Sequence, residues 1–217
     1  MNDFDALRRT MVDAQVRAND VADPRIHAAM LAVPRERFVP TAKRAFAYAD
    51  VPAEVAPQRY ILDPRTFGKM VQLAEIQITD RILDIGCATG YSSAILARLG
   101  KEVVALEQDA DLVRMASEIL PTVGETRIAV VQGGLVEGVK GLAPFDVIFI
   151  NGAIETVPDA LFGQLAEGGR LVTVLQQNAA GKATLFVKQN GAVGHRTSFD
   201  AGVPMLAGFR KAVGFVF

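Results

Sequence analysis

The sequence has few of the features that mark secreted, metal-binding or membrane-inserted proteins. Among its 217 residues Cys87 is the sole cysteine, so no internal disulfide can form, and nothing indicates a structural zinc site. No apolar run approaches the ~18 residues of a membrane span. The first residues, MNDFDALRRTMVDAQVR, contain acids and lack the apolar core of a signal peptide. These absences predict a cytoplasmic protein that binds no metal.

Neither sign of charge dominates the sequence. The 23 Lys and Arg residues nearly cancel the 24 Asp and Glu residues, so we expect no strong field that steers nucleic acid or an anionic membrane to the protein. Hydrophobic residues make up 50% of the chain, which is ample for a core. The length suits one large domain, or one domain with an added segment.

The first 76 residues show helical patterns interrupted by proline. Apolar residues recur at helical spacing over 2–19, and Asp23-Pro24 and Asp63-Pro64 each provide an N-cap and a first-turn proline. We therefore predict helices over 2–19, 25–33 and 64–76. Residues 34–60 contain four prolines and no clear periodicity. Long irregular stretches are usually functional, and we expect this one to lie over the cleft of the main domain.

From residue 81 the sequence alternates between short apolar runs and helical segments. The runs are rich in Val, Ile and Leu with little alternation, as in a parallel sheet covered on both faces. Asn190-Gly191 then predicts a hairpin turn. We predict strands over 81–85, 102–107, 127–132, 145–150, 169–175, 183–189, 192–199 and 212–217, and helices over 91–99, 110–120 and 158–165.

These patterns predict an α/β fold. It is a Rossmann-like, doubly wound and mostly parallel sheet with antiparallel C-terminal strands, preceded by an N-terminal helical segment. We divide the chain into residues 1–76, an N-terminal helical segment with a substrate loop, and residues 77–217, the main ligand-binding domain.

A glycine turn between the first predicted strand of this domain and the following helix marks a nucleotide cleft. Its spacing is Gly86-x-x-x-Gly90, and Ala88 stands where the dinucleotide fingerprint needs its middle glycine for a pyrophosphate. The P-loop lysine is also missing. A nucleotide with a pyrophosphate is therefore disfavoured as the ligand, and so is an NTPase.

Two acids flank this turn. Glu107 follows it by about 20 residues, the spacing at which a carboxylate accepts from ribose hydroxyls on the neighbouring strand. Asp84 lies inside the apolar strand beside the turn, where it can face the ammonium group of a ligand. The alternative is structural: Asp84 caps the N–H groups of the turn, and Glu107 is a solvated strand end.

An adenine nucleoside that carries an amino acid and no phosphate is S-adenosylmethionine. LDIGCATGY (83–91) and ALEQD (105–109) resemble the first two motifs of the S-adenosylmethionine-dependent methyltransferases. VPRERFVP (33–40), AYAD (47–50), residues 144–172 and FDAGVPMLAGF (199–209) resemble, more specifically, the protein-L-isoaspartate O-methyltransferases. That family methylates the carboxylate of isoaspartyl residues in damaged proteins, a repair reaction.

The resemblance implies which residues bind S-adenosylmethionine. The glycine turn passes under its methionyl part, Glu107 holds the ribose, residues after the third strand line the adenine, and Asn151 lies near the reacting end. The predicted cofactor-binding residues are Asp84, Gly86, Cys87, Ala88, Thr89, Gly90, Tyr91, Glu107, Gln108, Gly133, Gly134 and Asn151.

The sequence departs from the family in the substrate loop. A typical loop reads GQTISQPYM, but here Tyr60 replaces the threonine and Leu62 replaces the serine. Gln132-Gly133-Gly134 also replaces the usual Gly-Asp-Gly. Tyr60, Leu62 and Asp63 are the substrate-loop candidates, with Asp63 alternatively a helix cap. A carboxylate acceptor is ionised at neutral pH because the pKa of an unperturbed carboxyl group is ~4, so its methylation requires no general base.

Three functions remain open at this point. The first is repair methylation of isoaspartyl residues in a protein or peptide. The second keeps the cofactor and the fold but transfers the methyl group to a different acceptor, such as a small molecule. The third is a non-catalytic protein that binds S-adenosylmethionine or S-adenosylhomocysteine. A nicotinamide-dependent dehydrogenase is a more distant fourth.

Overall fold

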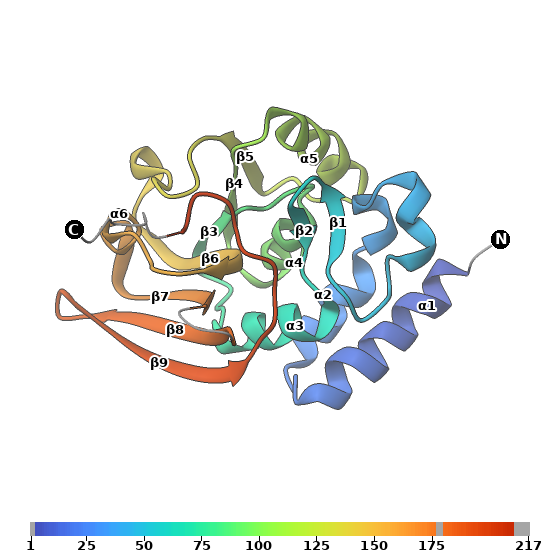
Figure 1. Ribbon diagram of the computed structural model, residues 1–217, viewed down its shortest axis with the longest axis horizontal. Helices are drawn as coiled ribbons and strands as arrows, with labels where there is room; N and C mark the ends of the chain where they lie inside the picture. The colour runs from blue at the N-terminus through green and yellow to red at the C-terminus, as the bar shows by residue number, and fades with distance from the viewer. Residues whose placement is uncertain (1–2, 177–179, 211–217) are drawn as a thin grey trace, which may run out of the picture.

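A seven-stranded sheet forms the centre of the computed structural model, which describes residues 3–176 and 180–210. The strand order is β5-β4-β3-β6-β7-β8-β9 (Figure 1), in which β5 to β7 pair in parallel and β8 and β9 add in antiparallel fashion. The predicted α/β class with antiparallel C-terminal strands is confirmed. The strands are β3 Arg81–Ile85, β4 Glu102–Glu107, β5 Ile128–Gln132, β6 Phe145–Ile154, β7 Leu165–Leu175, β8 Lys182–Gln189 and β9 Ala192–Asp200.

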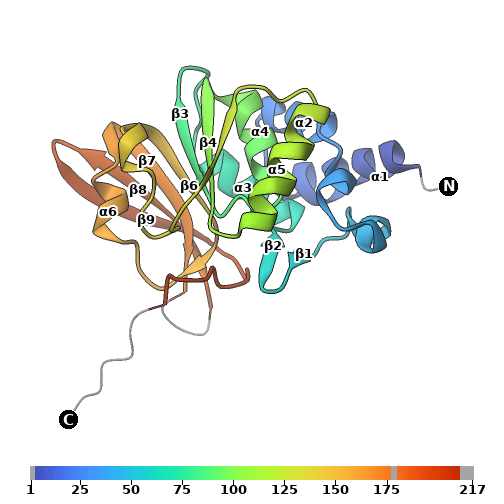
Figure 2. The ribbon, with the colours of Figure 1, turned by 90° about the horizontal axis from the view of Figure 1, so that it is seen from above.

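The helices that follow the early strands cover one face of the sheet, and the N-terminal helices lie outside them (Figure 2). Apolar side chains fill the space between the sheet and these helices, and the space between these helices and the N-terminal ones. Met30, Ile95 and Val103 are among those that are buried in this one continuous core. The N-terminal segment is therefore packed on the main domain through helices that themselves pack on the sheet. The bounds are α1 Phe4–Met11, α2 Pro24–Ala32, α3 Pro64–Leu73, α4 Tyr91–Leu99, α5 Ala110–Thr122 and α6 Asp159–Phe162.

The predicted helix caps are confirmed. The Asp23 carboxylate accepts from the Arg25 backbone N–H at 2.8 Å, and the Asp63 carboxylate accepts from that of Thr66 at 2.8 Å. The helix predicted over residues 2–19 begins with α1 and continues as a π-helical turn, Val12–Val16, and a 3₁₀ turn, Arg17–Asn19.

The stretch from 34 to 60 is more regular than its prolines suggest. It contains two 3₁₀ helices, Arg35–Phe38 and Thr41–Phe46, and its end enters a two-stranded hairpin of β1 Ala53–Ala56 and β2 Arg59–Ile61. The prediction of an irregular segment was therefore wrong for this part. Short 3₁₀ helices and three-residue strands are below the length at which periodicity reports them.

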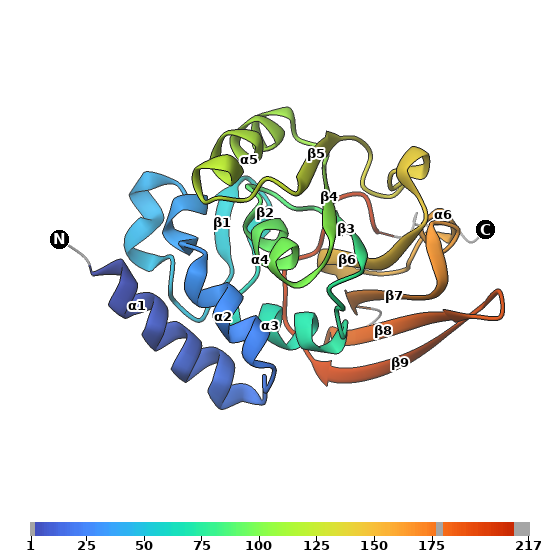
Figure 3. The same ribbon diagram turned by 180° about the vertical axis from the view of Figure 1, so that it is seen from behind.

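Two other predictions change. The helix predicted over 158–165 is a single turn, α6, because Leu165 already pairs with Phe145 at the start of β7. The strand predicted over 212–217 lies outside the described residues. The hairpin turn at Asn190-Gly191 is confirmed: both residues have positive φ and join β8 to β9, which extend from the end of the molecule opposite α1 (Figure 3).

The connections place a crevice at the carboxyl end of β3. The chain moves from β3 outward to β4 and β5, and then returns to pair β6 on the other side of β3. In open α/β sheets ligands bind at such a switch point. The glycine turn and Asn151 both lie there. In the part of the chain that the structure describes, no helix is long and apolar enough to cross a membrane.

Candidate active site

The glycine turn adopts backbone conformations that side chains disfavour. Gly86 and Gly90 have φ of +73° and +95°, and Ala88 between them has φ of +51°. The Gly90 N–H donates to the Cys87 carbonyl at 2.8 Å, which closes the turn in front of α4. Glycine therefore stands at both ends of the turn for a conformational reason. A Cβ on Gly86 would lie 3.1 Å from Leu206 and 3.4 Å from Arg59, so these two side chains cover the turn.

Glu107, at the end of β4, is buried beside this turn and accepts several hydrogen bonds. Its side chain is 0% exposed. One carboxylate oxygen accepts from the Ala88 N–H at 2.9 Å, and the other accepts from the N–H groups of Gln108 at 2.9 Å and Asp109 at 3.2 Å. The structural alternative of a solvated strand end is wrong. Glu107 is held in place by backbone, as expected of a carboxylate that presents an acceptor to a ligand.

Arg59 is the functional residue that sequence reasoning missed. Its guanidinium extends from β2 and forms a buried ion pair with Glu107 through Nη2. Its Nε and Nη1 are also buried, and neither has a hydrogen-bond partner among the described residues. No sequence signal indicated this contact, because Arg59 belongs to a three-residue strand in the proline-rich stretch.

Asp84 is fully buried and is held by polar groups of two elements. It accepts from the hydroxyls of Ser92 at 2.7 Å and Ser93 at 2.5 Å, at the start of α4, and from the side-chain amide of Asn151 at 2.5 Å. Burial raises the pKa of Asp84 to about 6. The donors are side chains of α4 and β6 rather than the N–H groups of the turn, so the capping role considered from the sequence is not what these contacts provide.

Asn151 owes its position to an irregularity in β6. The register of β6 against β7 shifts between Phe149 and Ala153, and such bulges redirect side chains beside active sites. The Asn151 amide also donates to the Ile85 carbonyl at 3.2 Å. The bulge therefore aims Asn151 across the crevice at the strand that carries the glycine turn.

The motif VPRERFVP ties the N-terminal segment to this turn. The Thr89 hydroxyl donates to the Phe38 carbonyl at 2.6 Å. Arg35, which is fully buried, donates to the carbonyls of Ala47 at 2.7 Å and Leu62 at 2.9 Å, and its guanidinium lies 4.8 Å from the centre of the Tyr91 ring. The motif thus positions the substrate loop over the crevice.

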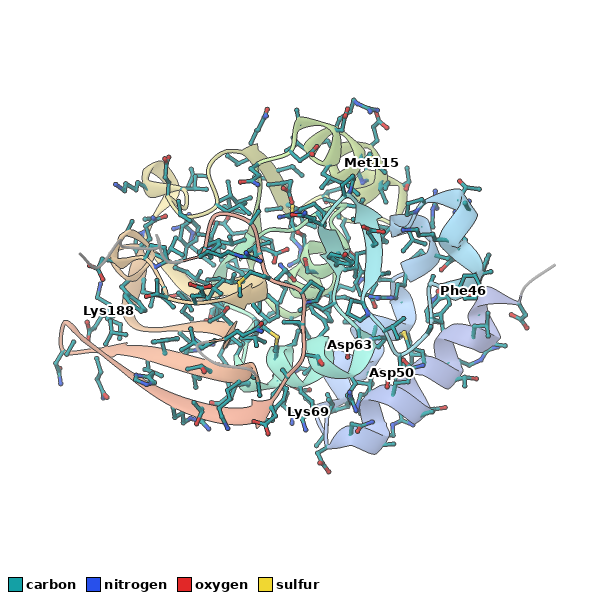
Figure 4. All side chains as sticks on the ribbon, viewed as in Figure 1. Phe46, Asp50, Asp63, Lys69, Met115 and Lys188 are labelled. Atoms are coloured by element: carbon teal, nitrogen blue, oxygen red, sulfur yellow. The ribbon has the colours of Figure 1, made fainter. Side chains whose placement is uncertain are left out.

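The three substrate-loop candidates do not lie together. Tyr60 and Leu62 line a small cavity with Gly86, Cys87, Ser92 and Asn151. Asp63 caps α3 and lies in a separate polar cavity of about 260 Å³, which Asp50 and Lys69 also line (Figure 4). Asp63 is therefore a structural cap that lines a cavity other than that of Tyr60 and Leu62.

The remaining predicted cofactor residues follow the ends of the strands. The Gly133 N–H donates to the Glu107 carbonyl at 3.0 Å, so the segment after β5 lies beside the end of β4, and Gln108 is exposed. Cys87 is buried, and burial raises the pKa of its thiol well above the usual value. In the described part of the chain, no three His, Cys, Asp or Glu side chains gather in a way that can hold a metal.

The residues of this crevice fit S-adenosylmethionine in kind. Gly86 provides a backbone cradle without a Cβ, and Glu107 is a fixed carboxylate of the kind that accepts from ribose hydroxyls. The cavity near Gly86, lined by Tyr60 and Asn151, is small. Arg59 and Leu206 both lie against Gly86, so a ligand that rests on this turn would have to displace them.

Comparison with known proteins identifies the family. The profile of the protein-L-isoaspartate(D-aspartate) O-methyltransferase (PCMT) family matches residues 7–202. The protein-L-isoaspartate O-methyltransferase of Koribacter versatilis is 37% identical over 193 residues, which are 89% of this chain and 86% of that protein. The protein of the same name from Methanoculleus marisnigri is 37% identical over 186 residues, 86% of this chain and 84% of its own length.

Two solved structures show the same fold. One, named protein-L-isoaspartate O-methyltransferase, has a TM-score of 0.79 at 24% identity and covers 94% of this chain and 66% of its own. The other is a protein from Plasmodium falciparum in complex with S-adenosyl-L-homocysteine. It has a TM-score of 0.80 at 20% identity, and the match covers 95% of this chain and 99% of that protein. With the profile matching nearly the whole chain, the protein belongs to the protein-L-isoaspartate(D-aspartate) O-methyltransferase family.

Proposed function

We propose that the protein transfers a methyl group from S-adenosylmethionine to the free carboxylate of isoaspartyl residues in proteins or peptides. The observation that carries this proposal is the family match over residues 7–202. The buried carboxylate of Glu107 beside the Gly86 turn supports it, because the pair suits a nucleoside without a pyrophosphate. The cytoplasm is the proposed location, and nucleic acid is not a proposed partner.

The resemblance to the family implies a role for each of these residues, and the geometry is compatible with it. Glu107 would hold the ribose hydroxyls, Gly133 and Gly134 would border the adenine, and Gly86 would lie under the methionyl part. Asp84 orients Ser92 and Asn151, which line the cavity while Asp84 lies behind them. When bound, the cofactor supplies an electrophilic methyl group on a sulfonium.

The residues near Gly86 would favour transfer by alignment and by excluding water. The acceptor is already ionised, so no side chain has to remove a proton. Leu62 and Phe67, each 2% exposed, form an apolar wall beside the turn. A dry site suits this reaction because opposite charges are neutralised as the methyl group moves. Alignment alone can supply effective molarities of ~10⁵–10⁸ M.

The test is a methanol-release assay. The purified protein is incubated with methyl-labelled S-adenosylmethionine and an isoaspartyl peptide, and volatile methanol is counted after base treatment. The same peptide with a normal aspartyl residue is the control. We expect methanol from the isoaspartyl peptide only. No methanol above the control, from protein shown by calorimetry to bind S-adenosylhomocysteine, would reject the proposal.

One observation favours a second candidate, a methyltransferase of this family with a different acceptor. Tyr60 and Leu62 line the cavity at the positions where the sequence pattern of the family has hydroxyls, and leucine cannot donate a hydrogen bond to a carboxylate. A screen of small molecules and intact proteins with labelled cofactor would identify that acceptor. Binding of cofactor without any methylated product would instead indicate a non-catalytic binding protein.

A further inference from the structure

Arg59 is the side chain in the crevice whose role the proposed function leaves unexplained. It is 5% exposed and reaches from β2 over Gly86 to Glu107. The ribose of the cofactor and Arg59 therefore require the same carboxylate. Only one of them can bind it at a time, because the other three contacts to Glu107 come from backbone N–H groups, one in the glycine turn and two directly after β4.

The Arg59 guanidinium has more N–H donors than the Glu107 carboxylate accepts from. Nε and Nη1 are buried and have no hydrogen-bond partner within residues 3–176 and 180–210. A buried guanidinium with free donors is costly unless it is also used elsewhere, since each unpaired buried donor loses its hydrogen bonds to water. The guanidinium binds carboxylates with two parallel N–H bonds or end-on through one.

The position of Arg59 also supplies what the substrate loop lacks. Arg59 directly precedes Tyr60 and lies three residues before Leu62. These two residues replace the threonine and the serine of the family's substrate loop. The Leu62 carbonyl is fixed by Arg35 at 2.9 Å, so the end of the hairpin that carries Arg59 is anchored. A carboxylate that enters the small cavity lined by Tyr60 and Asn151 would lie beside this cation, because Gly86 lines that cavity and is next to the Arg59 guanidinium.

We propose that Arg59 exchanges one carboxylate for another: it pairs with Glu107 until a ribose takes that carboxylate, and it then binds the carboxylate that accepts the methyl group. This inference rests on the proposed function. One acceptor oxygen binds the guanidinium and the other attacks the methyl carbon. The new bond is O–CH₃, the bond that breaks is S–CH₃, and its electron pair stays on sulfur. The product ester is neutral and no longer holds Arg59.

The first experiment measures binding of S-adenosylhomocysteine by calorimetry to the unmodified protein, R59Q and R65Q. Arg65 is exposed at the start of α3, so R65Q has the same change in charge and is the matched control. We expect R59Q to bind at least fivefold more tightly, because ribose no longer has to displace a cation, and R65Q to bind like the unmodified protein. Unchanged or weaker binding by R59Q would overturn the exchange.

The second experiment measures peptide binding in the presence of saturating S-adenosylhomocysteine. An isoaspartyl peptide is compared with the same peptide carrying isoasparagine, which has the shape but not the charge. We expect the unmodified protein to prefer the acid at least tenfold, R59Q to show no preference, and R59K to show a weaker preference. If R59Q keeps the preference of the unmodified protein, Arg59 does not bind the acceptor.

The two failures are distinguishable. An unmodified protein that shows no preference for the acid and releases no methanol would contradict the proposed function. A preference that survives in R59Q would contradict only the role of Arg59. Thermal unfolding and near-ultraviolet circular dichroism establish that the variants are folded. If R59Q is unstable, R59K provides the second test, because lysine keeps the charge. We expect R59K to bind S-adenosylhomocysteine about as tightly as the unmodified protein, since the ribose still has to displace a cation. A fivefold gain in affinity would overturn the exchange.

Discussion

The Thr89 hydroxyl donates to the Phe38 carbonyl at 2.6 Å, and both residues are fully buried. This bond joins the N-terminal segment to the glycine turn. It makes the turn dependent on a motif whose Phe38 lies 51 residues upstream of Thr89. Loss of the bond should therefore weaken both the turn and the packing of the N-terminal segment on it.

Thr89→Val tests this connection. Valine has nearly the shape of threonine but leaves the Phe38 carbonyl buried without its donor, which costs about 1–3 kcal/mol. We expect a lower free energy of unfolding in urea and weaker binding of S-adenosylhomocysteine. Thr89→Ser, which keeps the hydroxyl, is the control and should lie close to the unmodified protein. Equal stability of the valine and serine variants would contradict the role of the bond.

Asp84 should make stability depend on pH in an unusual direction. Burial raises its pKa from the ordinary 3.8 of an aspartate to about 6, so the folded protein binds a proton more tightly than the unfolded chain. The stabilisation is complete below pH ~4 and is lost as the pH rises through ~6, a change of about 3 kcal/mol. Ionised carboxylates in ion pairs have the opposite effect.

The comparison of Asp84→Asn with the unmodified protein isolates this contribution. The difference in free energy of unfolding between the two should shift by about 2–3 kcal/mol in favour of Asn from pH ~4 to pH ~7. Asp111→Asn, at a side chain that is 84% exposed, is the control and should show no such shift. Urea unfolding across this pH range is the measurement. A difference that stays constant with pH would show that the pKa of Asp84 is not raised.

Arg35 should be irreplaceable by lysine. Its guanidinium donates to the Ala47 and Leu62 carbonyls in two directions, which a single ammonium cannot reproduce. We expect Arg35→Lys to lower the free energy of unfolding by about 3 kcal/mol, since it loses two hydrogen bonds of a charged group at roughly 1.5 kcal/mol or more each. The β1–β2 hairpin should also loosen.

Limited proteolysis at Glu54, in β1, reports that loosening. Glutamyl endopeptidase should cut Arg35→Lys faster than the unmodified protein under native conditions. Arg37→Lys is the matched control, because Arg37 belongs to the same 3₁₀ helix but is exposed, and its cleavage rate should not change. Equal rates for the two variants would mean that Arg35 does not hold the hairpin.

Sequence patterns predicted the parts of this site that depend on neighbouring parallel strands. Glu107 was predicted from its spacing to Gly86, and the register that pairs Ile85 with Leu106 places its carboxylate beside Ala88. The family, the α/β class and S-adenosylmethionine as the cofactor of the family are likewise confirmed. The position of Glu107 could be predicted because adjacent parallel strands end at the same edge of the sheet, whereas the family and its cofactor were predicted from the resemblance of the motifs.

Contacts between distant segments could not be predicted. Arg59 and Leu206 meet at Gly86 from a short hairpin and from the segment after β9. Leu206 is fixed there by its backbone N–H, which donates to the Ala153 carbonyl at 2.8 Å. Neither residue belongs to a periodic pattern. Their burial depends on how loops pack after the sheet has formed, which local propensity does not describe.

Glu107 and Arg59 should show strong coupling in stability. Glu107→Gln leaves the buried guanidinium without its counter-charge, and breaking a buried pair in this way costs about 3–5 kcal/mol. Adding Arg59→Met removes the unpaired charge, so the double variant should recover much of the loss. Neither variant should bind S-adenosylhomocysteine, because both lack the carboxylate for the ribose.

Urea unfolding and calorimetry of the unmodified protein, Glu107→Gln, Arg59→Met and the double variant complete the cycle. Arg59→Met alone should lose less stability than Glu107→Gln, since three backbone N–H groups continue to hold the Glu107 carboxylate. A double variant as unstable as Glu107→Gln would mean that the loss comes from packing rather than from charge. Cofactor binding by Glu107→Gln at the affinity of the unmodified protein would remove Glu107 from the ribose site, and with it the competition on which the exchange by Arg59 depends.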